Sequence, residues 1–69
     1  MNTKLHNALQ ARYIARKEEA AATLSVYYNN AVGIGEHPQI VDEMDKMVER
    51  YANADGCLRA LDEIGPLAN

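Results

Sequence analysis

The chain lacks the features that usually cross-link a small protein, anchor it in a membrane or direct its export. Its single cysteine, Cys57, excludes an intramolecular disulfide, and no cysteine–histidine group has the spacing of a zinc site. No apolar stretch approaches the roughly 20 residues that span a bilayer. The first seven residues hold no apolar run that could act as a signal peptide. Because an unpaired cysteine also fits a reducing compartment, we expect a soluble, cytoplasmic protein that contacts no membrane.

Positive charge is scarce and unevenly placed. The chain has 7 Lys and Arg residues against 10 Asp and Glu, for a net charge of −3. Without a long basic stripe, nucleic-acid binding is not expected. Residues 1–33 carry four basic and two acidic residues, a charge of +2, whereas residues 34–69 carry three basic and eight acidic residues, a charge of −5. The two halves are complementary in charge, which favours packing against each other.

Apolar residues recur at helical spacing in both halves. The first helix is predicted over about residues 3–30, which contain no glycine or proline, with Thr3 as a possible N-cap. The second is predicted over about residues 38–64, where apolar residues alternate at gaps of three and four like the a and d positions of a heptad. These positions are Ile40, Met44, Met47, Tyr51, Ala54, Leu58 and Leu61.

The connector, residues 31–37, is organised around Gly33 and Gly35. Glycine adopts positive φ without steric cost, so the backbone can leave a helix and reverse there. Pro38 suits the first turn of the next helix, with Glu36 or His37 in the capping position. A connector this short predicts two antiparallel helices.

The second helix contains one internal conflict and a clear end. Asp55-Gly56 is a turn signal, yet the heptad pattern continues in register across it. We therefore expect one continuous helix, with a kink or a short third helix as the alternative. Gly65-Pro66 predicts the end of this helix, with Gly65 as the C-terminal cap.

Residues that could carry chemistry do not form a complete site. Glu36 and His37 are adjacent, but one histidine and one carboxylate are too few for a metal site, and no Glu-x-x-His pair of a di-iron bundle occurs. Cys57 has no histidine near it in sequence, which favours a packing thiol. An acidic set at helical spacing is read as a solvated face: Asp42, Asp45 and Glu49. We expect no catalytic residue, no metal and no cofactor.

The run Val32-Gly33-Ile34-Gly35-Glu36-His37-Pro38, followed by an acidic amphipathic helix, resembles small uncharacterised helical proteins of marine tailed phages and marine metagenomes. The resemblance covers the loop and the helix–loop–helix layout, about half of the chain. It implies a phage or marine microbial origin, and it implies no activity and no functional residues. Asp55-Gly56 departs from the expected pattern of such a helix.

The predicted fold is all-α: residues 1–69 form a single domain, an antiparallel two-helix hairpin that dimerises into a four-helix bundle. A chain of 69 residues is near the size at which one core is only marginally stabilising, and both apolar stripes are wider than one partner helix can cover. We interpret the protein as a non-enzymatic interaction or structural protein that self-associates. One alternative is a small regulatory or accessory subunit whose apolar face is completed by a different protein. Another is an enzyme with a site built from Glu36 and His37 across a dimer.

Two sets of residues are predicted to contact partners. The connector is the candidate contact with another protein, because exposed loops often carry function; its residues are Gly33, Ile34, Gly35, Glu36 and His37. The heptad positions of the second helix are the candidate self-association residues: Ile40, Met44, Met47, Tyr51, Leu58 and Leu61.

Overall fold

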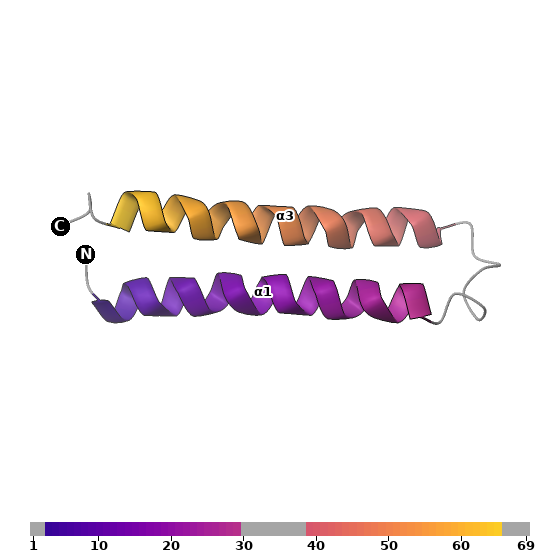
Figure 1. Ribbon diagram of the computed structural model, residues 1–69, viewed down its shortest axis with the longest axis horizontal. Coiled ribbons are helices and arrows are strands. Elements are labelled where there is room, and N and C mark those ends of the chain that lie inside the picture. The colour runs from indigo at the N-terminus through magenta and orange to yellow at the C-terminus, as the bar shows by residue number, and fades with distance from the viewer. Residues whose placement is uncertain (1–2, 30–38, 66–69) are drawn as a thin grey trace.

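Two long antiparallel helices make up the computed structural model, which describes residues 3–29 and 39–65. Helix α1 spans Thr3–Asn29 and helix α3 spans Ile40–Ile64. They lie side by side, so that the first turn of α1 is next to the last turn of α3 (Figure 1). The result is a rod of 52 × 15 × 12 Å. The predicted all-α antiparallel hairpin is therefore confirmed.

The ends of α3 are only partly as predicted. The helix begins at Ile40, with Gln39 in the N-cap position and without a side-chain capping hydrogen bond. Glu36 and His37, the predicted caps, lie outside the described residues, as does Pro38. Asp42 and Glu43 lie in the first turn, where their negative charge complements the helix dipole. Gly65 is the C-cap, but it has right-handed angles, φ −49° and ψ −50°, and its N–H donates to the Leu61 carbonyl.

The core consists of one narrow line of side chains between the helices. In the described part of the chain only Ala20 of α1 and Met47, Ala54 and Leu61 of α3 are buried. The three buried residues of α3 are spaced seven apart, so they occupy the same position of successive heptads. The residues at the other apolar position of the heptad are less buried: Met44 and Leu58 are half-buried and Tyr51 is exposed. A single neighbouring helix covers only a narrow stripe. The hairpin therefore covers most of the predicted heptad face at least in part and leaves Tyr51 exposed.

Helix α3 continues through Asp55-Gly56 without interruption. The prediction of a continuous helix is confirmed, and the kink and the third helix are not seen. No atom lies within 4 Å of the position that a Cβ at Gly56 would take, apart from the helix's own backbone and the adjacent residues. The glycine is thus not required by packing at this point.

Replacing Gly56 by alanine should raise the free energy of unfolding by about 1 kcal/mol, because alanine loses less backbone entropy in a helix. Urea denaturation at one fixed protein concentration measures the change. Ala60→Gly is the matched control, since Ala60 is also exposed on α3, and it should lower the free energy by a similar amount. A destabilised Gly56→Ala variant would contradict this account of the helix.

Candidate interaction surface

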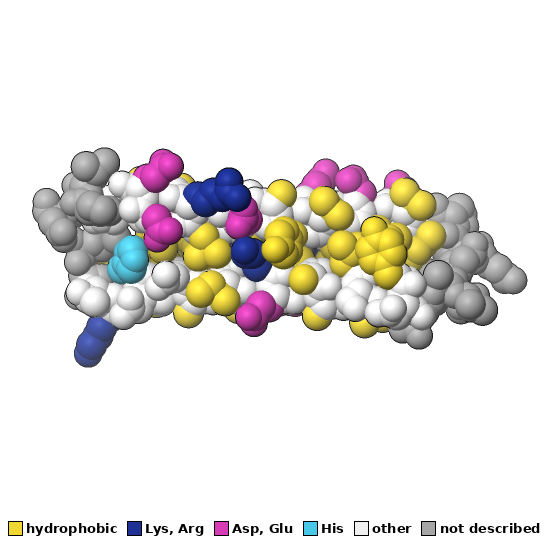
Figure 2. All heavy atoms as spheres, viewed as in Figure 1, with side chains coloured by type: hydrophobic (Ala, Val, Ile, Leu, Met, Phe, Trp, Pro, Cys, Tyr) yellow, Lys and Arg dark blue, Asp and Glu magenta, His cyan; other side chains and the backbone are white. Residues whose placement is uncertain are grey.

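The hairpin exposes many large apolar side chains. Hydrophobic side chains run along the junction of the two helices and reach onto the outer surface of both (Figure 2). The large hydrophobic residues that are exposed in the described segments are Leu5, Ile14, Val26, Tyr28, Val41, Val48, Tyr51 and Ile64. Single apolar residues at a surface are ordinary, but a contiguous apolar patch marks an interaction site.

One apolar groove gathers several of them along the junction of the helices. It has a volume of about 450 Å³, and we call it the apolar groove; its residues are Ala20, Ala21, Leu24, Ser25, Tyr28, Val48 and Tyr51. Alanine and serine have small side chains, so the α1 side of the groove leaves room for a neighbouring helix to approach. Tyr28 and Tyr51 supply aromatic surface from the two helices, and tyrosine is enriched at protein interfaces.

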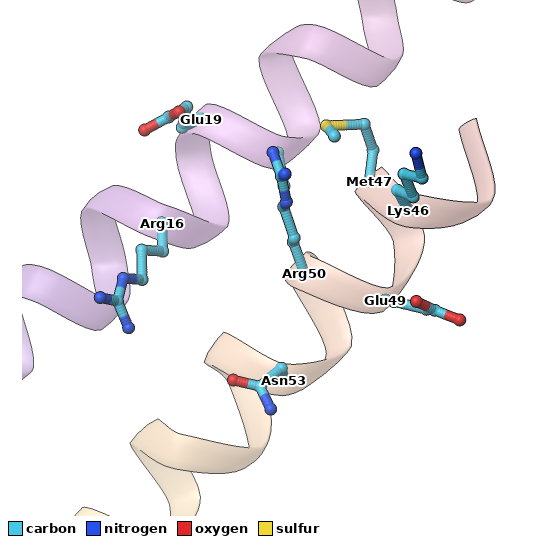
Figure 3. A pocket seen from close by; sticks show the side chains of 8 residues that line it. Arg16, Glu19, Lys46, Met47, Glu49, Arg50 and Asn53 are labelled. Carbon is cyan, nitrogen blue, oxygen red and sulfur yellow. The ribbon is translucent and has the colours of Figure 1, made fainter. Parts of the chain in front are cut away.

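A second groove lies along the opposite side of the junction. It has a volume of about 600 Å³, and we call it the charged groove; its residues are Arg16, Glu19, Ala20, Lys46, Met47, Glu49, Arg50 and Asn53. Figure 3 shows Arg50 and Met47 extending from α3 towards α1, whereas Glu49 points away from α1. In the charged groove, Lys46 is two residues before Val48 of the apolar groove, and Asn53 is two residues after Tyr51 of the apolar groove. Two residues correspond to about 200° around a helix, so the two grooves open on opposite sides.

A charged cluster borders the apolar groove and joins the helices. Lys17 Nζ of α1 donates to Asp55 Oδ1 of α3 at 3.1 Å. Arg59 pairs with the other Asp55 oxygen, also at 3.1 Å. Lys17 Nζ further lies 5.1 Å from the centroid of the Tyr51 ring, within the range of a cation–π contact. Residues of the two oppositely charged halves thus meet here, as the charge pattern predicts.

The same contacts hold both groups of this pair in their charged forms. The hydrogen bond from Lys17 lowers the pKa of Asp55, and the nearby Arg59 and Lys17 charges act in the same direction. The hydrogen bond to Asp55 raises the pKa of Lys17, against a smaller opposing effect of desolvation. Both shifts move the pKa values away from neutrality, so the pair stays charged throughout the neutral range. The charges at this border are therefore already compensated within one chain.

The predicted self-association residues divide into two groups. Met47 and Leu61 are buried against α1 of the same chain, so neither offers surface to a second copy unless the helices separate. Tyr51 is exposed, and the remaining three are half-buried: Ile40, Met44 and Leu58. The assignment of these six residues to self-association stays a prediction. The residues predicted as partner contacts, Gly33, Ile34, Gly35, Glu36 and His37, lie outside the described residues.

The candidates for chemistry take ordinary positions. Asp42, Asp45 and Glu49 are all exposed, as predicted for a solvated face, and Lys46 pairs with Glu43 at 3.3 Å. Cys57 is a half-buried free thiol, and its Sγ donates to Asn53 Oδ1 of the preceding turn at 3.7 Å.

The described segments, residues 3–29 and 39–65, contain no cluster of metal ligands and no candidate membrane span. Across these segments, no three His, Cys, Asp or Glu side chains come close enough together to hold a metal ion. Neither of the two helices combines the length and the apolar character needed to cross a bilayer.

Sequence reasoning did not identify the apolar groove, although the signal for it is present. Val48 widens the apolar stripe of α3 on one side only, and Tyr28 lies beside the stripe of α1. Placing both helices on a wheel with 100° per residue brings these residues to the same side of an antiparallel pair. The sequence matches no protein-family model, and neither a curated protein nor a solved structure is significantly similar to it.

Proposed function

We propose that this chain is a non-enzymatic helical interaction protein that self-associates, two hairpins packing side by side as a four-helix bundle. The observation that supports this most is the amount of surface that one hairpin leaves in water. The chain exposes 5321 Å². A globular monomer of 7.6 kDa is expected to expose about 4,300 Å².

The excess surface has the size of a protein interface. It amounts to about 1,000 Å² per chain on this scaling, and each partner in an interface of standard size buries about 800 Å². One contact between two hairpins would therefore bury an area of about the size of this excess. A dimer with two-fold symmetry is the commonest closed assembly, because the same patch serves on both chains.

A different partner is the competing proposal. The same exposed apolar surface would suit a small regulatory or accessory subunit whose core is completed by another protein. The two proposals differ in what the purified chain does alone, because only self-association doubles its mass. The cytoplasm stays the predicted location, and a phage or marine microbial origin stays what the resemblance of the connector implies.

Sedimentation equilibrium of the purified chain at micromolar concentration tests self-association. We expect twice the chain mass of 7.6 kDa, together with a helical circular dichroism spectrum. A folded monomer under these conditions would overturn self-association and favour the accessory subunit. Measuring mass and helicity on the same sample prevents an unfolded monomer from being taken for a folded one.

A further inference from the structure

We infer that the apolar groove is the surface through which two copies of the chain meet, and that the charged groove faces water in the dimer. This inference rests on the proposed self-association and adds which side of the hairpin is used. The occupant of the apolar groove is a second copy of the same groove, because the chain exposes about 1,000 Å² more than a globular monomer of its mass would, close to the area that each partner buries in a dimer interface of standard size.

The residues of the apolar groove gain most from being covered. Tyr28 is 67% exposed, Val48 is 50% exposed and Tyr51 is 41% exposed. Covering apolar area is worth about 25 cal/mol per Å², and two rings per chain bring aromatic surface to the same contact. Val41 and Ile14, both exposed, extend the apolar surface on the same side of the two helices by the 100° rotation per residue. A second hairpin laid along this side would cover residues from both helices.

The charged groove would cost more to cover. The ion pairs formed among the described residues join Lys17 with Asp55, Arg59 with Asp55, and Lys46 with Glu43. None of these pairs includes Arg16 or Arg50, which line the charged groove. Removing an unpaired charge from water carries a large penalty. On the other side, by contrast, Lys17 and Asp55 already compensate each other. Covering the apolar groove therefore removes fewer unpaired charges from water, which favours it over the charged groove as the surface between two copies.

Two pairs of matched substitutions test which side is used. Val48→Arg and Asn53→Arg each add one long cationic side chain at an exposed position of α3, in the apolar groove and the charged groove respectively. Tyr28→Ser and Val26→Ser each remove an exposed apolar side chain from α1. Only Tyr28 lines the apolar groove, since Val26 is about 200° away around the helix. The second pair keeps the test open if a charged variant fails to fold.

We expect Val48→Arg and Tyr28→Ser each to raise the dimer dissociation constant at least tenfold in sedimentation equilibrium. Asn53→Arg and Val26→Ser should leave it within about twofold of the unsubstituted chain. Circular dichroism at high protein concentration checks that each variant is helical. The assignment of the apolar groove is wrong if Asn53→Arg and Val26→Ser weaken the dimer while Val48→Arg and Tyr28→Ser do not. It is also wrong if all four variants dimerise as tightly as the original chain. In both cases self-association itself stands. A monomeric original chain would instead overturn the proposed function itself.

Discussion

Replacing Met47 by aspartate should unfold the chain. Met47 is buried between the two helices, and removing a buried methionine side chain costs about 2–5 kcal/mol even without adding a charge. A chain of this length has a total stability of about 3–10 kcal/mol on the usual scale per residue. The carboxylate adds a desolvation penalty, because only an opposite charge or a hydrogen bond could compensate it there. Loss of the helical signal at 222 nm, at every concentration tested, is the expected result.

Ala60→Asp is the matched control for Met47→Asp. Ala60 is exposed on the same helix and lies about 120° around it from Val48, so the same acidic group stays in water both in the hairpin and in the proposed dimer. The expected cost is only the difference in helix propensity, about 0.7 kcal/mol or less. The control should keep its helical spectrum and a thermal midpoint close to that of the original chain. A Met47→Asp variant that is as stable as the control would show that the contact between α1 and α3 is not the core.

Thermal stability should rise with protein concentration. When folding and dimerisation are linked, each tenfold dilution lowers the stability of the dimer by about 1.4 kcal/mol. Between 100 and 1 μM this amounts to about 2.7 kcal/mol per dimer. With about 2.1 cal/mol/K of unfolding entropy per residue over two chains, the midpoint should fall by roughly 9 °C. Melting curves followed by circular dichroism over this range measure the shift.

The Val48→Arg variant provides the comparison for this measurement. Weaker self-association should lower its midpoint at every concentration in this range, because less free energy of dimerisation stabilises the folded chains. A midpoint that is identical from 1 to 100 μM in the original chain would contradict linked folding and assembly, whatever the mass of the species present.

The sequence predicted the helices well because their signals are local. The first helix was predicted over about residues 3–30 and runs over Thr3–Asn29. The heptad spacing correctly predicted that the second helix continues through Gly56, where the glycine alone would have suggested a break. Local capping signals were less informative. Gln39 takes the N-cap position of α3 without donating or accepting a side-chain hydrogen bond there, so no residue type marks that boundary.

The interaction surface was harder to predict because it depends on how the helices face each other. A heptad pattern shows which side of a helix is apolar, but it does not show how much of that side one neighbour covers. Met47 and Tyr51 look equivalent in sequence, yet the first is buried within the chain and the second is exposed. The difference follows from the direction in which α1 approaches α3, and that direction is fixed by contacts from both helices together.

The narrow core also affects how freely the sequence can change during evolution. Interior packing fixes four side chains in the described part of the chain: Ala20, Met47, Ala54 and Leu61. Substitutions at the exposed positions of the helices meet water, so the hairpin alone places few restrictions on them. Descendants of one ancestral chain could therefore lose recognisable similarity while keeping the same two helices. If two copies meet through the apolar groove, selection would also act on the exposed residues of that groove. Tyr28, Val48 and Tyr51 would then change more slowly during evolution than their exposure suggests.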